Sequence, residues 1–255
     1  MNLTQMIFSR LLWIAALSSF GLEGKTIESR QSEESFHPKD DAQGYDYLLY
    51  KPSMQGAKKA NAKLPLLVFL HGRGERGNNL SQVKKHGPAK IVETKDMPFI
   101  IASPQCPRTD LWWKPKIVAG LVDELVRNHP IDPSRIYLTG LSQGGFGTWA
   151  TAAEFPGKFA AVAPICGGGK KEWAKKYGAL PIWNFHGDAD KVVPVRLSRV
   201  MVEAIKQAGG NVKHTEYSGV GHDSWTKTYR NPKLYEWFLS HSKRSRDSEG
   251  SKKKN

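Results

Sequence analysis

The chain has 255 residues, 39% of them hydrophobic and 24% charged, and its formal net charge at pH 7 is +14. This length suffices for one α/β domain with a full core. The charge would suit a nucleic-acid-binding protein if it clustered on one face, but much of it lies in scattered lysines and in residues 242–255, without a nucleic-acid-binding motif. We therefore predict no nucleic-acid partner, and a basic, disordered tail over residues 242–255.

The first 22 residues have the features of an export signal. Arg10 is the only early charge, and the apolar run over residues 11–22 is too short to span a membrane comfortably. An uncleaved membrane anchor is the alternative. We predict a secreted or periplasmic protein without stable membrane insertion after signal removal, in which residues 23–43 are a polar linker and residues 44–241 the folded domain.

From residue 45 onward, apolar runs alternate with amphipathic segments. The strand-like runs cover residues 45–50, 64–70, 98–102, 135–139, 159–165, 181–185 and 212–217. Helix-like segments cover residues 116–128, 197–208 and 232–240, and another begins near Gly145. This alternation predicts an α/β fold, a doubly wound and mostly parallel sheet flanked by helices, whose ligands bind beyond the carboxyl ends of the strands.

The pentapeptide from Gly140 to Gly144 matches the pattern G-x-S-x-G and places Ser142 between a strand-like run and a helix-like segment. A nucleophilic serine needs a tight turn there, with small residues two positions to either side so that the backbones approach closely. The helix N-terminus also favours developing negative charge. The pattern predicts Ser142 as a nucleophile, and an ordinary Gly/Ser loop is the alternative.

A hydroxyl is a poor nucleophile until a base removes its proton, and in this fold an acid and then a histidine follow the serine along the chain. Asp188 and Asp190 follow the run at residues 181–185, and either carboxylate is able to hold an imidazole. His222 lies in a glycine-containing loop after the last strand-like run. Chain order and this placement predict His222 as the base.

The oxyanion formed during such a reaction needs two backbone N–H donors. One comes from the residue after the nucleophile, Gln143, and the other from the loop after the third strand. His71-Gly72-Arg73-Gly74 follows the run at residues 64–70, which predicts Arg73 as the second donor. An ordinary glycine-rich turn is the alternative.

Several segments together resemble one family: FLHGRGERG, SPQCP, LTGLSQGGFGTW, APICGGG, FHGDADKVVP and GHDSW. They are similar to the secreted esterase branch of the α/β-hydrolases, also labelled phospholipase/carboxylesterase or predicted peptidase and related to feruloyl and polyhydroxybutyrate esterases. The resemblance covers residues 45–241. It implies Asp190 as the acid, with Asp188 as the alternative, Arg73 and Gln143 as oxyanion donors, and no metal or organic cofactor.

The sequence is less informative about the substrate. Trp112 and Trp113 follow the run at residues 98–102, and Trp225 lies three residues after His222, so these indoles are candidate substrate-binding groups. Core packing is the alternative for Trp112 and Trp113. The short, basic insert at residues 167–180 predicts a minimal cap and an open cleft, suited to a polymeric or bulky ester such as acylated polysaccharide or a phenolic ester.

Cys106 and Cys166 are the two cysteines of the chain. An exported protein permits a disulfide between them, but their spacing does not establish one, and two buried thiols are the alternative.

The favoured hypothesis is therefore a serine esterase, a carboxylic ester hydrolase that works through an acyl-enzyme. A serine peptidase with the same triad is the first alternative, although no acidic segment for binding a substrate N-terminus is visible. A non-catalytic polymer-binding module is the second, and it gives no reason to keep serine, histidine and aspartate together.

Overall fold

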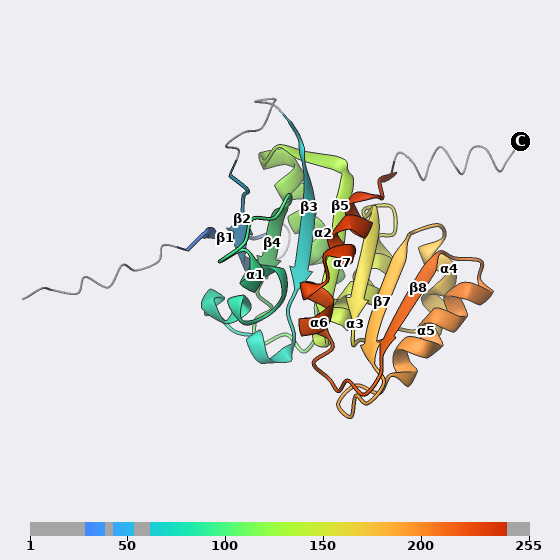
Figure 1. Ribbon diagram of the computed structural model, residues 1–255. Helices are drawn as coiled ribbons and strands as arrows, with labels where there is room; N and C mark the ends of the chain where they lie inside the picture. Colours follow the sequence, from blue (N-terminus) through green and yellow to red (C-terminus); the bar gives the residue numbers. More distant parts are fainter. Residues whose placement is uncertain (1–28, 39–42, 54–61, 244–255) are drawn as a thin grey trace, which may run out of the picture.

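The computed structural model describes residues 29–38, 43–53 and 62–243. The predicted export signal at residues 1–22 lies outside the described residues, and so does the predicted tail from residue 244 onward. Figure 1 shows the described part as one sheet flanked by helices.

Within the described residues, eight strands form the sheet, in the order β1-β2-β4-β3-β5-β6-β7-β8. The pairs β1/β2 and β2/β4 are antiparallel, and every pair from β4 to β8 is parallel. This confirms the predicted doubly wound, mostly parallel sheet. The strands are β1 (Gln31–Phe36), β2 (Tyr45–Tyr50), β3 (Leu64–Leu70), β4 (Ile100–Pro104), β5 (Ile131–Leu141), β6 (Ala161–Ile165), β7 (Ile182–Gly187) and β8 (Val212–Tyr217).

The prediction of a linker over residues 23–43 is wrong for β1. This segment has few apolar residues, but it pairs along its whole length with β2, so the backbone hydrogen bonds of the sheet order it. Its two ends point inward: Phe36 lies in the core, and Gln31 donates through Nε2 to the carbonyl of Ala89 at 2.9 Å. An edge strand needs only these few inward contacts, and composition alone does not reveal them.

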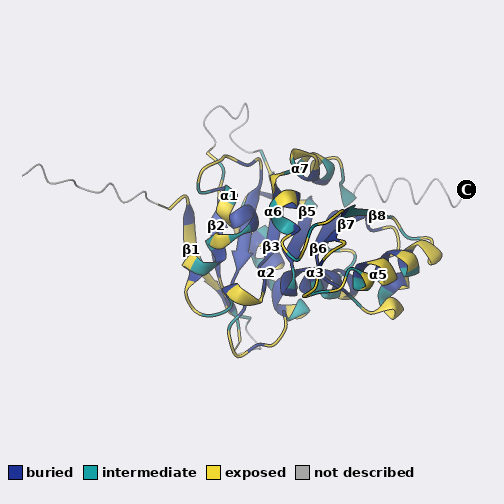
Figure 2. Ribbon diagram, turned by 60° about the horizontal axis from the view of Figure 1, so that its bottom comes forward, coloured by how far each residue is buried: buried dark blue, intermediate teal, exposed yellow. Residues whose placement is uncertain are grey.

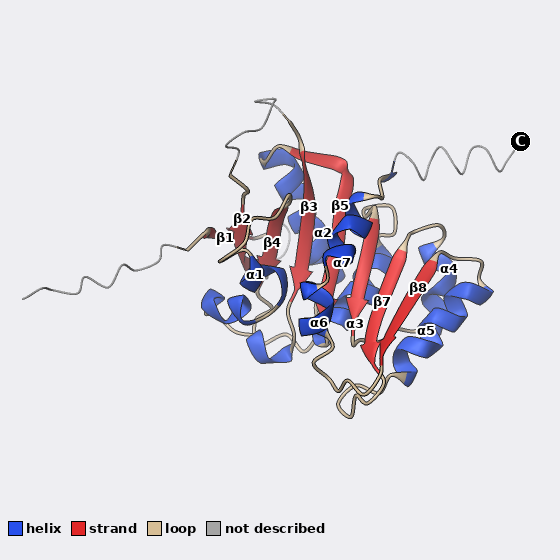
Figure 3. Cartoon of the chain, in the orientation of Figure 1, coloured by secondary structure: helices blue, strands red, loops and turns tan. Residues whose placement is uncertain are grey.

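Helices cover both faces of the sheet (Figures 1 and 3). One face carries α2 (Pro115–Asn128), α3 (Gln143–Glu154), α4 (Ala174–Tyr177) and α5 (Arg196–Gln207), and the other carries α1 (Gly87–Ile91), α6 (Trp225–Arg230) and α7 (Pro232–Leu239). The short 3-10 helices are η1 (Arg73–Glu75), η2 (Leu80–Lys85) and η3 (Lys171–Trp173).

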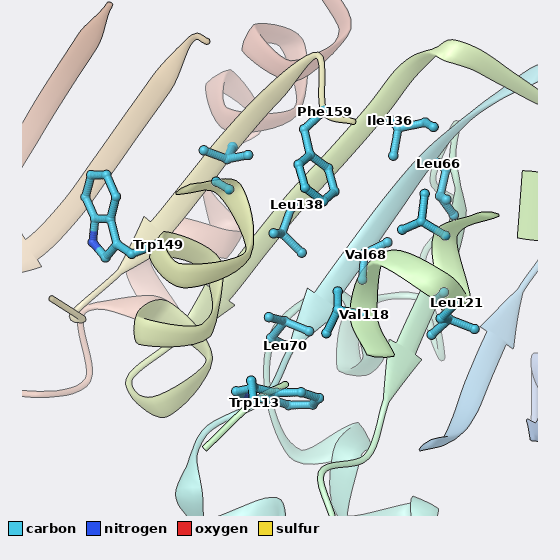
Figure 4. Packing of buried hydrophobic residues seen from close by; sticks show 14 of the residues in the cluster. Leu66, Val68, Leu70, Trp113, Val118, Leu121, Ile136, Leu138, Trp149 and Phe159 are labelled. Carbon is cyan, nitrogen blue, oxygen red and sulfur yellow. The ribbon is translucent and has the colours of Figure 1, made fainter. Parts of the chain in front are cut away.

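The central strands are buried on both sides, as their continuous apolar runs predict (Figure 2). Successive side chains of β3 alternate between the two faces. Leu66, Val68 and Leu70 pack in the cluster under α2, which contributes Val118 and Leu121 (Figure 4). Leu67 and Phe69 belong to the opposite cluster, together with residues of α6 and α7. The two clusters fix the sheet between its helical layers.

The predicted minimal cap at residues 167–180 forms η3 and α4. The hydroxyl of Tyr177 donates to the carbonyl of Trp149 in α3 at 3.0 Å, and the two rings pack edge to face. The insert thus joins the helical layer beside α3.

The parallel strands bring four chain segments to one edge of the sheet. Ser142 follows β5 directly, Asp190 follows β7, His222 follows β8, and the segment with Arg73 follows β3. Because parallel strands end on the same side, these residues meet at the carboxyl edge.

Gly144 is the tightest point of this arrangement, because a Cβ added there would lie 1.9 Å from the carbonyl oxygen of Leu70. We expect Gly144→Ala to lower the free energy of unfolding by about 3 kcal/mol, since neither backbone is able to yield. Chemical denaturation measures the loss. The matched control is Gly157→Ala, where an added Cβ meets nothing within 4 Å; similar losses in both variants would contradict the packing argument.

Candidate active site

Ser142 lies on a tight turn between β5 and α3. Its φ of 52° and ψ of −115° fall outside the ordinary regions for a residue with a Cβ. Glycines allow the crowding around it: a Cβ at Gly140 would lie 2.4 Å from the carbonyl oxygen of Gly144, and one at Gly145 would lie 2.3 Å from that of Ile165. The strained turn presents a half-buried serine at the edge of the sheet.

Ser142, His222 and Asp190 form a continuous hydrogen-bonded chain. Nε2 of His222 lies 2.9 Å from Oγ of Ser142, and Nδ1 lies 2.7 Å from Oδ2 of Asp190. An ionised carboxylate only accepts hydrogen bonds, so Nδ1 carries the ring proton and Nε2 is free to accept the serine proton. The Asp190 side chain is fully buried, whereas 20% of the His222 side chain is exposed. A ligand therefore reaches the imidazole but not the carboxylate.

Asp190 is held by donors on several sides. Its Oδ1 accepts from the backbone N–H groups of Val192 at 2.8 Å and Val193 at 2.9 Å. Burial by itself would raise the pKa of Asp190, but the hydrogen bonds from His222 and from these two amides outweigh burial and hold the pKa below its usual value. The carboxyl group is therefore ionised at neutral pH.

Asp188, the alternative acid, is exposed and contacts the loop before His222 instead of the imidazole. Its Oδ1 accepts from the N–H of Gly219 at 2.7 Å, which ties down the loop that precedes His222. The geometry thus selects Asp190 as the carboxylate in contact with His222, a choice that spacing alone left open.

The two predicted oxyanion donors lie where chain order placed them. Gln143 is the first residue of α3 and Arg73 is the first residue of η1, which follows β3. The first N–H groups of a helix have no acceptor within the helix, so both amides are available to a ligand. The Gln143 side chain points elsewhere, since its Nε2 donates to the carbonyl of Leu111 at 2.6 Å.

His71 fixes the segment that carries Arg73. Its Nδ1 donates to the carbonyl of Gly72 at 2.5 Å, and its Nε2 accepts from the N–H of Cys106 at 3.0 Å. Burial lowers the pKa of His71 to about 4, so the ring is neutral at ordinary pH and both nitrogens are satisfied in one tautomer. His71 is therefore a structural support for the loop.

His186 is a residue of the site that the sequence analysis missed. It is buried at the end of β7, with Nε2 3.1 Å from Oδ2 of Asp190 and 2.8 Å from the carbonyl oxygen of Val193. Because that carbonyl only accepts, Nε2 carries the proton and also faces the carboxylate. Nδ1 lies 2.7 Å from Oγ of Ser198. The sequence did contain a feature that points to His186, because it lies four residues before Asp190 at the end of a buried strand.

The three candidate tryptophans have different surroundings. Trp113 is 4% exposed, packs edge to face on Tyr45, and donates through Nε1 to the carbonyl of His71 at 3.3 Å. This burial favours core packing, the alternative for Trp113, over substrate binding. Trp112 is 58% exposed and packs on Phe146 of α3. Trp225 packs edge to face on the imidazole of His222.

Cys106 and Cys166 are both free and buried, so they form two buried thiols and not a disulfide. Cys166 lies beneath the serine turn, where its Sγ accepts from the N–H of Ser142 at 3.3 Å. Burial raises the pKa of Cys106 and of Cys166 to about 12, so both thiols stay protonated.

No three His, Cys, Asp or Glu side chains of the described residues form a group that would hold a metal ion. In the same part of the chain, no helix has the length and apolar character needed to cross a membrane.

Serine, aspartate and histidine follow β5, β7 and β8 in that chain order, and the histidine is hydrogen-bonded to both of the others at the carboxyl edge of the doubly wound sheet. This combination defines an α/β-hydrolase. Residues 115–233 match the family model described as Phospholipase/Carboxylesterase. Over these residues, which make up just under half of the chain, the sequence is similar to that family.

Three relatives illustrate the similarity. The chain is 55% identical over 51 residues to poly(3-hydroxyalkanoate) depolymerase C of Paucimonas lemoignei. The aligned residues make up 20% of this chain and 12% of the relative. It is 27% identical over 163 residues to a bifunctional acetylxylan esterase/xylanase of Neocallimastix patriciarum. This alignment covers 62% of this chain and 23% of the relative. The crystal structure of a thermostable esterase matches with a TM-score of 0.72 and 33% identity, over 84% of this chain and 63% of that chain. The chain thus spans less than a quarter of each of these two curated relatives.

The buried His71 makes a pH-dependent contribution to stability. Unfolding returns its pKa from about 4 to about 6.5, so the unfolded chain binds the extra proton first as the pH falls. We expect the free energy of unfolding to decline between about pH 6.5 and pH 4, with about 3 kcal/mol of the decline due to this group. Urea titrations across that window check it. His71→Gln should show a shallower decline, and an unchanged slope would contradict the assignment.

The contact between His186 and Asp190 predicts a positioning role. We expect His186→Leu to lower kcat by about 10-fold with little change in KM, because Asp190 loses a donor that steadies it beneath His222. His186→Gln, which keeps an N–H donor, should recover part of the loss. Steady-state kinetics on an aryl acetate measure both. Equal losses in the two variants, tracking a loss of folded protein, would indicate packing instead.

Proposed function

We propose that the protein is a carboxylic ester hydrolase that acts through an acyl-enzyme on Ser142. One observation carries the proposal: the hydrogen-bonded chain from Asp190 through His222 to Ser142, with distances of 2.7 and 2.9 Å. The names of the relatives, which include esterases and depolymerases, support the same reaction class.

In the proposed reaction, Oγ of Ser142 attacks the ester carbonyl while Nε2 of His222 takes the hydroxyl proton. The N–H groups of Arg73 and Gln143 stabilise the oxyanion of the tetrahedral intermediate. His222 then gives its proton to the leaving alcohol, and the acyl group remains on Ser142. Water, deprotonated by His222, attacks the acyl-enzyme. His222 returns this proton to Oγ of Ser142 as the bond to the acyl group breaks and the carboxylic acid leaves.

The surface beside Ser142 favours a bulky or polymeric ester. Leu111 is 73% exposed and Trp112 58% exposed, and the side chain of Gln143 ties their loop to the start of α3. A fixed, exposed indole with an aliphatic neighbour offers a flat apolar platform for a sugar or phenolic ring. We therefore propose an acylated polysaccharide or a phenolic ester as the substrate class. Trp112 and Trp225 are the proposed substrate-binding indoles.

A peptidase with the same triad would have to protonate a poorer leaving group. The acylaminoacyl peptidases among the structural neighbours are 16% to 18% identical, a similarity that reflects the fold alone. A non-catalytic binding module would not need an aligned triad.

Export is proposed from residues 1–22 and from the similarity to an uncharacterized secreted protein of Arthroderma benhamiae. The two are 24% identical over 209 residues, and the alignment covers 67% of this chain and 22% of that protein.

The test is hydrolysis of aryl acetates, methyl ferulate, acetylated xylan and peptide anilides by the wild type and by Ser142→Ala. We expect ester cleavage by the wild type and a loss of at least about 1,000-fold in kcat/KM in the variant, because the acyl-enzyme has no oxygen on which to form. An active-site phosphonate should label the wild type alone, as mass spectrometry of the intact protein would show. The matched control is Ser218→Ala, an exposed serine outside the triad.

Cleavage of the anilides but of no ester would replace this proposal with the peptidase. Lack of activity on the whole panel, together with retained binding to xylan, would favour the binding module.

A further inference from the structure

Glu75 is a nearly buried carboxylate that the proposed reaction does not use. It ends η1, and its side chain is 9% exposed. A Cβ added at Gly72 would lie 3.2 Å from Oε2 of Glu75 and 3.7 Å from Cβ of Ser142. The carboxylate and the proposed nucleophile therefore both lie close to one glycine, in the segment that leads to Arg73.

The other carboxylate oxygen is connected to the base through a series of ring contacts. Oε1 of Glu75 lies 3.8 Å from Nε2 of His86. The His86 ring packs edge to face on Trp225 with centroids 5.6 Å apart, and Trp225 packs in the same way on His222 at 5.2 Å. Glu75, His86 and Trp225 thus form a continuous wall from the serine turn to the imidazole. In ester hydrolysis the leaving alcohol lies beside the base, because the base protonates it, so this wall faces the alcohol.

The carboxylate has acceptor capacity left over. Within the described part of the chain, its ion-pair neighbours are His71 at 4.0 Å and His86 at 3.8 Å, both beyond hydrogen-bond distance, and no hydrogen bond to its oxygens is formed there. Because no donor of the described residues engages these oxygens, they are free to accept a hydrogen bond from a ligand.

The surroundings select the kind of donor. The exposed Arg73 and the partly exposed Arg76 lie close by in sequence, and the chain carries a net charge of +14. This positive environment disfavours an ammonium group and leaves a neutral hydroxyl as the matching donor.

Resting on the proposed esterase function, we infer that Glu75 binds a free hydroxyl on the alcohol part of the substrate. The preferred substrates are then partial esters of polyols, such as sugars that carry one acyl group beside an unesterified hydroxyl. Glu75 is a specificity-determining residue that accepts this hydrogen bond while Ser142 attacks the neighbouring ester.

The experiment compares two esters that differ by one hydroxyl: the monoacetate of trans-1,2-cyclohexanediol and cyclohexyl acetate. We expect the wild type to prefer the diol ester by at least about 10-fold in kcat/KM, and Glu75→Leu to abolish most of this preference. Glu75→Gln keeps a neutral acceptor, so its preference for the diol ester should lie between those of the wild type and Glu75→Leu. Glu172→Gln, an exposed carboxylate on η3, is the matched control and should keep the wild-type ratio.

The ratio of the two substrates separates binding from folding, because a loss of folded protein lowers both rates equally. An unchanged ratio in both Glu75 variants would overturn the inference while the esterase proposal stands. A wild type that prefers acetylcholine to its neutral isostere 3,3-dimethylbutyl acetate, with the preference lost in Glu75→Leu, would also overturn it, since the carboxylate would then recognise cations. Absence of ester hydrolysis by the wild type would instead overturn the proposed function.

Discussion

The close approach of three backbones around Ser142 is the constraint on which the site depends. The end of β3, the turn after β5 and the start of α3 meet at Gly140 and Gly144, where any Cβ would strike a carbonyl group. This crowding helps to hold Ser142 at a positive φ, a conformation that costs about 1 to 3 kcal/mol. The two apolar clusters that clamp the sheet supply the free energy that maintains it.

Asp190 is the buried, ionised carboxylate at the carboxyl edge of the sheet. It accepts from His222, from two backbone amides and from His186. The hydrogen bonds from His222 and from the two amides reverse the effect of burial on its pKa. A buried anion held in this way keeps the imidazole of His222 in the tautomer whose Nε2 faces the serine. The aspartate therefore acts through orientation, and its own supports matter as much as its charge.

The surroundings of the triad divide into two surfaces of different character. On one side, Leu111 and Trp112 form an exposed platform that Gln143 fixes to α3. On the other, Glu75, His86 and Trp225 form a wall that ends on His222. The proposed substrate, a ring-shaped and partly esterified alcohol, uses both features: the apolar platform for its ring and the carboxylate of Glu75 for its free hydroxyl.

Local pattern alone determined the parallel sheet, its flanking helices and the positions of Ser142 and His222, because strand periodicity and the G-x-S-x-G turn depend on near neighbours in the chain. Only the tertiary structure decided the rest. It ordered the polar β1 by pairing, chose Asp190 over Asp188, buried Trp113 and left both cysteines free. It also brought His186 and Glu75 to the site. Each of these outcomes rests on contacts between segments far apart in sequence, and no local periodicity encodes such distances.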